Sequence, residues 1–355
     1  MFALTYMKHI LMLAVAIFLI GCTEAPKHTL FPTERMLTSL PVPVDTVLLR
    51  FPYRIAVEED IMLVMDLHPE RDYLHAFSLP EGKHIKSFGR RGQAGDEMLS
   101  AENFRFCSFD SIWILDANRM NIVRWSLAVT SANAVREEAI NLDKSLVRTL
   151  DFCLTDSGFI IPDYLGDSRY NFVGWNGIPS ASAGIIPVKK NKRANSVALA
   201  QGWRSFFALN PDKNVLATAT QLGEVIEIYR LDSISHTVVY GSMGEPQFQV
   251  VHGEALPVGI MGYFDIQATD NYIYALFSGK TFKEIQKNAM TGTINERGGR
   301  FIHVYDFQGN PVCIYLLDRA VCGIDVHENE GLIYAVDANG DDPVVVFRID
   351  GHIPR

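Results

Sequence analysis

The hydrophobic and polar positions beyond residue 45 follow the pattern of a chain built from short strands. Runs of β-branched, aromatic and aliphatic residues alternate with turns rich in Asp, Asn, Gly and Ser, and few segments show the period of an amphipathic helix. Examples are residues 61–66, 112–116 and 332–336, each of which follows a polar turn. The pattern therefore predicts an all-β fold.

One turn position recurs along the chain and divides it into six units. The turns lie at residues 59–60, 110–111, 156–157, 211–212, 270–271 and 329–331, a spacing of roughly 46 to 60 residues. The repeat predicts a single six-bladed β-propeller domain over residues 46–355, with four antiparallel strands in each blade. A β-sandwich is the alternative, but it would not repeat one turn at this period.

The first strand of the predicted domain, residues 46–49, has no partner in its own unit. We expect it to pair with the last blade around residues 343–349, because an open ring would leave two unpaired strand edges.

Two stretches interrupt the repeat. Residues 177–203 predict a loop with one helical turn near 197–201, and residues 281–300 predict an insertion at the rim or over the channel.

The N-terminus has the pattern of a bacterial export signal. A basic residue, Lys8, precedes the apolar run of residues 10–20, which is shorter than the roughly 20 residues of a membrane span. The run ends in Leu19-Ile20-Gly21-Cys22, which resembles the lipobox of bacterial lipoproteins. This resemblance implies that residues 1–21 are removed and that Cys22 is acylated. An ordinary signal followed by a chance cysteine is the alternative.

The segment after the predicted lipid site, residues 22–45, contains four prolines among polar residues, a composition typical of a tether with little regular structure. We expect the lipid on Cys22 to hold the protein to a membrane of the cell envelope. The outer membrane is the expected location, with the domain on the periplasmic or the cell-surface side. Either Met1 or Met7 can be the start of the signal.

The amino-acid composition limits the classes of partner and the cysteine chemistry that we expect. A hydrophobic content of 48% with 21% charged residues excludes wholesale disorder, and a formal net charge of -9 argues against nucleic acid as a partner. Four cysteines remain besides Cys22, namely Cys107, Cys153, Cys313 and Cys322. A disulfide between Cys313 and Cys322 is one interpretation, and buried free thiols are the one that we favour.

Several segments resemble the TolB-like six-bladed propeller lipoproteins of Gram-negative anaerobes. They are residues 272–280 (YIYALFSGK), 302–311 (IHVYDFQGNP) and 331–336 (GLIYAV). Residues 87–97 (SFGRRGQAGDE) look like the glycine-rich phrase that ends a blade in such propellers, although they depart from its usual Gly-Pro-Gly-Glu core. The resemblance implies a six-bladed fold and an envelope lipoprotein, and it implies no particular activity.

Two turns carry the candidate binding residues. Arg90 and Arg91, followed by Asp96 and Glu97, place mixed charge on the glycine-rich loop, where backbone N–H groups can approach an anion. A solvated turn between blades is the alternative. The second candidate is Trp175, which lies in a Gly-Trp-Asn-Gly turn. An exposed indole there would suit stacking on a sugar or a peptide, whereas a packed one would be structural.

The sequence contains no HExxH pair and no Gly-x-Ser-x-Gly elbow, and we predict no catalytic residues, no metal site and no cofactor. One turn resembles the opening of a calcium loop. Asp337, Asn339 and Asp341 alternate there as Ca²⁺ ligands would, but Arg348 stands where the distal Glu should be. A plain strand turn explains the same residues.

These observations predict a lipid-anchored binding or scaffolding module, with an envelope protein or a glycan as its partner. The alternative is an enzyme, a lyase or hydrolase that acts on a carbohydrate or a lactone at the mouth of the channel. Inward-facing His, Arg and carboxylate groups at one mouth would favour the enzyme. A channel lined by apolar and small residues would count against it.

Overall fold

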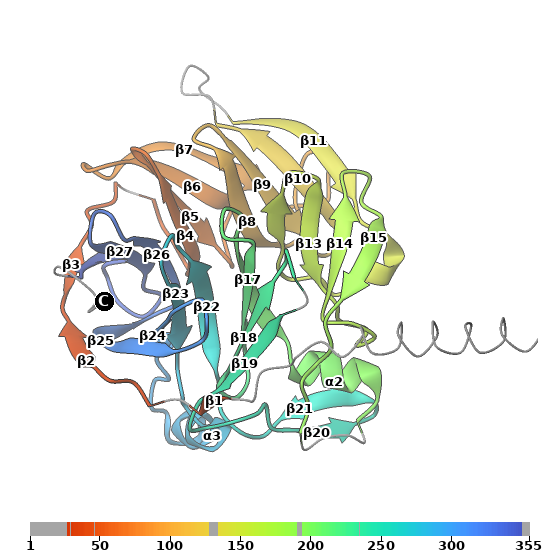
Figure 1. Ribbon diagram of the computed structural model, residues 1–355. Coiled ribbons are helices and arrows are strands. Elements are labelled where there is room, and N and C mark those ends of the chain that lie inside the picture. The colour runs from red at the N-terminus through yellow and green to blue at the C-terminus, as the bar shows by residue number, and fades with distance from the viewer. Residues whose placement is uncertain are drawn as a thin grey trace, which may run out of the picture.

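The fold is a closed ring of six β-sheet blades, as the sequence predicted (Figure 1). The structure, a computed structural model, describes residues 27–28, 30–45, 47–127, 134–189, 194–233 and 235–349. The predicted signal and Cys22 lie outside the described residues. Within the described residues, no helix is long and apolar enough to cross a membrane.

Each blade is built on four antiparallel strands, which follow one another from the channel outwards. Blade 1 contains β4 (Pro52–Glu58), β5 (Ile61–Asp66), β6 (Asp72–Ser78) and β7 (Lys83–Arg90). Blade 2 contains β8 (Ala101–Ser108), β9 (Ser111–Asp116), β10 (Asn121–Ser126) and β11 (Val135–Asn141). Blade 3 contains β12 (Cys153–Thr155), β13 (Gly158–Pro162), β14 (Tyr170–Gly174) and β15 (Pro179–Ala183).

The second half of the ring has the same plan. Blade 4 contains β16 (Ser205–Asn210), β17 (Val215–Thr220), β18 (Val225–Arg230) and β19 (His236–Tyr240). Blade 5 contains β22 (Tyr263–Ala268), β23 (Ile273–Phe277), β24 (Gly299–Tyr305) and β25 (Pro311–Val321). Blade 6 contains β26 (Gly323–His327), β27 (Leu332–Val336), β28 (Val344–Arg348) and β3 (Ser39–Pro41).

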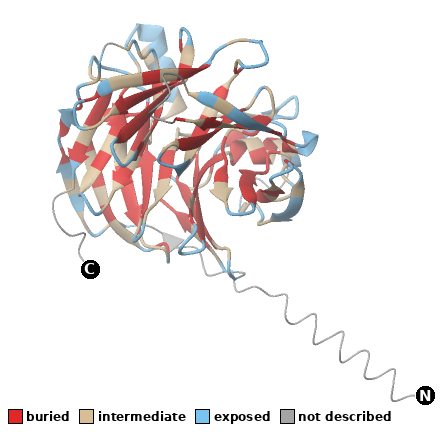
Figure 2. Ribbon diagram, turned by 90° about the horizontal axis from the view of Figure 1, so that it is seen from above, coloured by how far each residue is buried: buried red, intermediate tan, exposed pale blue. Residues whose placement is uncertain are grey.

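The six turns found in the sequence all join the first strand of a blade to the second. We call the side of the ring where the first strands begin the start face, and the side where they end the end face. The second strands β5, β9, β13, β17 and β23 are buried along their whole length. Each lies in the middle of its sheet with a neighbouring blade on either face, so both of its faces are buried, as the red strands of Figure 2 show.

The N-terminal part of the chain closes the ring, but through a different segment from the predicted one. β3 pairs antiparallel with β28 and forms the outermost strand of blade 6. Residues 47–49, the described part of the predicted strand 46–49, lie outside any strand. Val47 and Leu49 pack instead against the apolar cluster between blades 6 and 1. Their apolar character reflects this packing, which sequence periodicity cannot distinguish from strand pairing.

The segment predicted as a tether, residues 22–45, contributes two further strands to the ring. β1 (Lys27–His28) pairs parallel with β19 of blade 4, and β2 (Glu34–Leu37) pairs parallel with β25 of blade 5. The proline at the end of β3 is tolerated because that strand is at the edge of its sheet. The chain therefore joins the domain at Lys27, five residues after Cys22.

Three insertions lie in connections on the start face. They are α2 (Ser196–Gly202), the hairpin of β20 (Phe248–Val251) and β21 (Glu254–Pro257), and α3 (Phe282–Thr291), while a short 3-10 helix, η1 (Lys144–Leu146), precedes blade 3. α2 confirms the helical turn expected near 197–201. A capping box of Thr281 and Glu284 begins α3, and Gly292 ends it with φ of 70°.

The four cysteines of the described residues are free. Cys313 and Cys322, whose pairing was one interpretation of the sequence, are both buried but do not form a disulfide. Cys313 packs between blades 5 and 6, whereas Cys322 packs between blades 6 and 1. The two thiols are kept apart because they belong to different layers of the core.

A buried aspartate recurs where the second strand of a blade ends. Asp66, Asp116, Asp163 and Asp337 occupy this position in blades 1, 2, 3 and 6. Asp66 accepts hydrogen bonds from the backbone N–H groups of Arg50 and of two other residues, and the other three carboxylates likewise accept from loop N–H groups. These carboxylates satisfy loop backbone groups that would otherwise be unpaired, so their role is structural.

Asp151, just before β12, connects three blades at the channel wall. Its carboxylate accepts hydrogen bonds from Asn103 Nδ2 and Arg105 Nη2 of blade 2, at 2.7 and 2.9 Å. It also accepts from the backbone N–H of Phe207 in blade 4, at 2.8 Å. Since Asp151 is almost completely buried, loss of its carboxylate would leave the Asn103 amide and the Phe207 N–H without this acceptor in a place that water does not readily reach.

Blades 5, 6 and 1 are joined in the same way. Asp265 of β22 accepts from the backbone N–H of Ile324 in β26 at 3.0 Å, and Asp325 of β26 accepts from the backbone N–H of Val57 in β4 at 2.6 Å. Gln267 donates to Asp325 at 2.7 Å. The polar side chains of the inner strands thus hold the inner strand of one blade in a fixed position along the channel axis relative to the inner strand of the next blade.

The most deeply buried ion pair joins Arg169, before β14, to Glu227 of β18. Arg169 Nη2 lies 2.7 Å from Glu227 Oε1, and both side chains are at most 2% exposed. Tyr229 donates a hydrogen bond to the same carboxylate at 2.6 Å. Burial opposes ionisation of Glu227, but Arg169, His236 and Tyr229 outweigh it and lower its pKa to about 2. The carboxylate is therefore ionised throughout the physiological pH range.

Replacing Glu227 with Gln is expected to destabilise the protein by about 3 to 5 kcal/mol, because Arg169 would keep a buried charge without its partner. Urea unfolding at pH 7 measures this change. The double variant Arg169→Met/Glu227→Leu leaves no charge unpaired, so it should cost less than the sum of its two single variants. A cost for Glu227→Gln below about 1 kcal/mol would contradict this account of the pair.

The same pair makes stability depend on pH in a defined window. The pKa of Glu227 falls from 4.5 to about 2 on folding, so its contribution is complete above pH 4.5 and is lost as the pH falls toward 2. The difference in unfolding free energy between wild type and Glu227→Gln should shrink across this window. A difference that stays constant down to pH 2 would count against the assignment.

Replacing Asp151 with Ala is expected to cost about 3 to 5 kcal/mol, because a partly buried guanidinium, a buried amide and a backbone N–H lose their common acceptor. Thermal or urea unfolding measures this loss. Asp212→Ala, at an exposed turn of the neighbouring blade, is the control and should change stability by no more than about 0.5 kcal/mol. Equal effects of the two substitutions would show that Asp151 does not hold the blades together.

Candidate functional site

A groove of about 830 Å³ opens on the end face, over blades 2, 3 and 4. The last residues of β8, the turns that follow β12 and β16, and the connection between β14 and β15 contribute to its lining. Its aromatic, basic and apolar side chains include Phe106, Trp113, Trp175, Arg105, Arg124 and Pro211. The lining combines flat apolar surface with a few hydrogen-bonding groups, as ligand-binding sites commonly do.

Trp175 is held in place along one edge and remains 43% exposed. Its Nε1–H donates to the backbone oxygen of Asp156 at 3.3 Å, and its ring packs 5.6 Å from Trp113 and 5.2 Å from Phe159. The tight turn depends on Gly177, with φ of 76°, where a Cβ would lie 1.9 Å from the oxygen of Asn141. The exposed part of the indole is therefore presented to the groove in a fixed orientation.

Two arginines supply the polar part of the groove. Arg105 makes the ion pair with Asp151 described above while its side chain remains 29% exposed. Arg124 donates from Nε to Ser111 Oγ at 2.9 Å and lies 3.3 Å from Glu137. The terminal N–H groups of Arg105 already donate to Asn103, Asp151 and the backbone oxygens of Phe104 and Phe207. Arg124, which is engaged through Nε and is 41% exposed, can donate further hydrogen bonds to a ligand without rearranging.

The two thiols of the groove, those of Cys153 and Cys107, differ in burial. Burial raises the pKa of Cys153 to about 12, so its thiol stays protonated at neutral pH. Cys107 is exposed and donates a hydrogen bond to the backbone oxygen of Ser111 at 3.2 Å. The arrangement of the groove suits recognition of a ligand better than acid–base or nucleophilic chemistry.

The channel itself forms a smaller cavity of about 260 Å³, lined by polar groups of the inner strands. Arg54 is buried, donates to the backbone oxygen of Cys322 at 3.3 Å, and lies 4.6 Å from the ring of Phe206 on the opposite side of the ring of blades. Burial raises the pKa of Asp265, and Arg54 opposes that shift. The channel thus holds Arg and carboxylate groups, the residue types that would favour an enzyme.

These channel groups nevertheless have structural partners. Asp151, Asp265 and Asp325 each accept backbone N–H groups of a neighbouring blade, as described above. His327 lies 3.1 Å from Asp325, and this hydrogen bond raises the pKa of the imidazole. Asp151, Asp265 and Asp325 are therefore already engaged between blades, whereas Glu58, which also lines the cavity, is exposed.

The loop of residues 90–97, which carries four of the predicted binding residues, lies on the start face, and its charged side chains contact other groups of the same loop. Arg90 Nε lies 3.4 Å from Glu97 Oε1, and Glu97 also accepts from the backbone N–H of Ala94 at 2.9 Å. Arg119 donates to the backbone oxygen of Ala94 at 2.6 Å. The loop therefore directs carbonyl oxygens toward basic side chains, which differs from the nest of N–H groups expected for an anion site.

The other predicted residues of this loop, Arg91 and Asp96, do not approach Trp175. The loop connects β7 to β8 on the start face, whereas Trp175 lies on the end face. Of the predicted binding residues, Trp175 alone lines the groove. Three other residues of the groove were not predicted from the sequence, namely Arg105, Arg124 and Phe106. The position of each arginine within an otherwise apolar strand was a signal that could have drawn attention to it.

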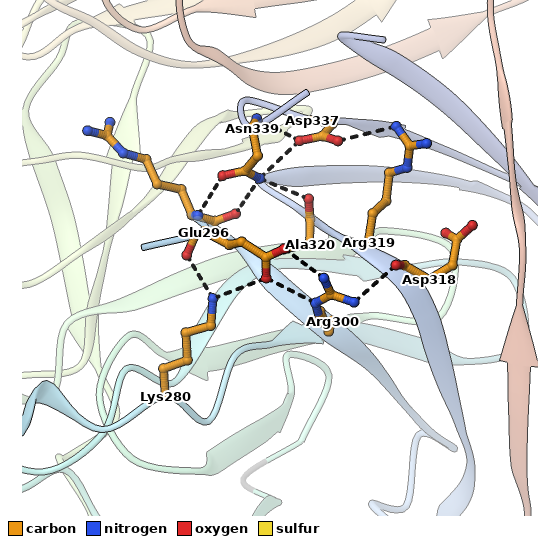
Figure 3. A network of polar contacts seen from close by, with 9 residues as sticks. Lys280, Glu296, Arg300, Asp318, Arg319, Ala320, Asp337 and Asn339 are labelled. Carbon is orange, nitrogen blue, oxygen red and sulfur yellow. Dashed lines mark hydrogen bonds and ion pairs between the residues drawn. The ribbon is translucent and has the colours of Figure 1, made fainter. Parts of the chain in front are cut away.

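The turn with calcium-like spacing is held together by amide and basic groups (Figure 3). Asn339 Oδ1 accepts from the backbone N–H of Arg297 at 2.7 Å, and its Nδ2 donates to Asp337 Oδ1 at 2.9 Å. Asp337 Oδ2 lies 3.3 Å from Arg319. Asp341 lines the adjoining surface pocket of about 440 Å³. In the part of the chain that the structure describes, no group of three His, Cys, Asp or Glu side chains could hold a metal ion.

Comparison with known proteins agrees with the architecture. The model of the TolB-like six-bladed propeller family matches residues 31–329. A Bacteroides fragilis protein described as exported has a TM-score of 0.54 at 10% identity, with 90% of this chain and 99% of that chain covered. A member of the DUF4221 family from Bacteroides vulgatus has a TM-score of 0.53 at 9% identity, with 88% and 95% covered.

At these identities the two solved structures show a shared fold alone. No curated protein matches the sequence. The family match, in contrast, spans most of the chain and reaches all six blades. The chain therefore belongs to the TolB-like six-bladed propeller family.

Proposed function

We propose that this protein is a lipid-anchored binding protein of the cell envelope, which takes its ligand in the groove around Trp175. The anchor is the lipid on Cys22 that the lipobox-like segment predicts, and the outer membrane is its proposed location. The basic residue Lys8 and the apolar run of residues 10–20 support a site of action outside the cytoplasm. The net charge of -9 supports a partner other than nucleic acid.

One observation carries the binding role, namely the immobilised and partly exposed indole of Trp175 beside two partly exposed guanidinium groups. A sugar ring has an apolar face that stacks on an indole and hydroxyl groups that accept hydrogen bonds from arginine. We therefore favour an oligosaccharide as the ligand. Binding of a peptide instead is an outcome that the same experiment can detect. The proposal does not extend to catalysis, because Asp151, Asp265 and Asp325 of the inner strands are committed to contacts between blades.

Replacing Cys22 with Ser is expected to abolish acylation and to release the protein from the membrane fraction, because a serine hydroxyl cannot carry the thioether-linked lipid. Intact-mass measurement of the protein purified from membranes tests for the lipid directly. Cys107→Ser is the control, since it removes a thiol that is exposed in the described structure and should leave both properties unchanged. An unmodified Cys22 in the mature wild-type protein would refute lipid anchoring.

Replacing Trp175 with Ala is expected to weaken binding of the ligand at least about fivefold, because stacking on an aromatic ring commonly contributes about 1 kcal/mol or more. The wild-type protein is titrated with a panel of neutral and acidic oligosaccharides and of short peptides. Tryptophan fluorescence and calorimetry, recorded during each titration, identify the ligand and measure its affinity. Phe109→Ala removes another exposed aromatic residue of the end face and serves as the control.

Wild-type affinity should survive in Phe109→Ala and fall in Trp175→Ala. If no oligosaccharide binds the wild-type protein but a peptide does, the groove is a peptide site. Equal affinities of wild type and Trp175→Ala would place the ligand elsewhere on the protein.

A further inference from the structure

Exposed apolar side chains gather on insertions at the start face of blades 4 and 5. The hairpin β20–β21 exposes Val250, Val251 and Leu256, and the segment from α3 onward exposes Met290 and Ile294. These elements and β1 lie along the lower edge of the molecule in Figure 1. An exposed apolar patch of this kind is typical of a surface that contacts a partner or a membrane.

The hairpin is built so that one side of it stays uncovered within the described structure. Phe248 and Ala255 pack toward α2, where Phe248 joins the cluster of Trp203. The backbone N–H of Ala255 donates to the side chain of Gln201 in α2 at 2.9 Å. The valines near the tip make no corresponding contribution to a core cluster. A two-stranded ribbon is marginal alone, so packing on α2 keeps this apolar tip in position.

α3 has the composition of a helix that lies on a membrane surface. Each of its ten residues is exposed or only partly buried. Lys283 and Lys287 are exposed beside the apolar Met290. Basic side chains next to apolar ones allow a helix to contact lipid headgroups while its apolar side chains enter the boundary of the acyl region.

The N-terminal segment brings the predicted lipid close to this edge. β1 pairs with β19 of blade 4, and Leu30, which is 90% exposed, lines a surface groove of about 500 Å³ together with Met243. Met243 precedes the hairpin by five residues. Cys22 is five residues before Lys27, and five residues span at most about 18 Å even when fully extended. An anchor this short cannot hold the domain far from the bilayer.

We propose that the start-face edge of blades 4 and 5 rests on the lipid bilayer, with Val250, Val251 and Leu256 of the hairpin at the membrane surface. This inference rests on the proposed anchoring through Cys22. The bilayer covers the apolar tip of the hairpin, and the lysines of α3 contact headgroups. The groove around Trp175, on the end face, stays open to the aqueous phase. The propeller is therefore an oriented receptor rather than a body moving freely on a tether.

The test uses the full-length acylated protein in phospholipid vesicles that contain nitroxide-labelled phosphatidylcholine. An environment-sensitive fluorophore is attached at V251C in a Cys107→Ser background, because Cys107 is the exposed native thiol. The matched control is V135C, another exposed valine, on β11 at the outer edge of blade 2. We expect the membrane nitroxide to quench the fluorophore at position 251 and to leave the one at position 135 unchanged.

Intact mass is measured on the same samples, so that the two proposals fail separately. A protein without lipid would overturn the anchoring itself. An acylated protein with equal quenching at both positions, or with quenching at position 135 alone, would overturn the orientation. L256C, on the other strand of the hairpin, repeats the measurement if V251C does not fold, and it should be quenched in the same way.

Discussion

Closure of the ring is the constraint on which the rest of the structure depends. Each blade buries both faces of its middle strands against two neighbours, so blades 1 and 6 cannot complete their cores unless they meet each other. The pairing of β3 with β28 provides that contact, and it places the N-terminal chain in the sheet of the C-terminal blade. Any unfolding of this short strand would expose the apolar layers on both sides of blade 6.

The same closure determines how the domain relates to its predicted anchor. Because residues 27–28, 34–37 and 39–41 are all built into blades, little chain is left between Cys22 and the folded body. The proline-containing segment has the composition of a spacer, but its strands β1, β2 and β3 pair with the outer strands of blades 4, 5 and 6. A lipid on Cys22 would consequently position the domain as well as retain it.

The buried polar groups of this propeller serve mainly its architecture. The recurring aspartates Asp66, Asp116, Asp163 and Asp337 bind loop N–H groups, and Asp151, Asp265 and Asp325 hold one inner strand against the next. Charged groups in a channel therefore do not by themselves indicate catalysis. What matters is whether a group has spare hydrogen-bonding capacity, and in this molecule the groove around Trp175 offers that capacity together with an aromatic surface.

The sequence by itself determined the fold class, the number of blades and the six turns, because these depend on local alternation of apolar and polar residues and on a repeat that survives without knowledge of contacts. It also singled out Trp175 from its turn. Only the tertiary structure decided that Ser39–Pro41 rather than residues 46–49 closes the ring, that Cys313 and Cys322 face different core layers, and that Arg105 and Arg124 join Trp175. Those facts depend on which strands become neighbours across hundreds of residues, and strand pairing between distant segments is set by packing that a local pattern does not contain.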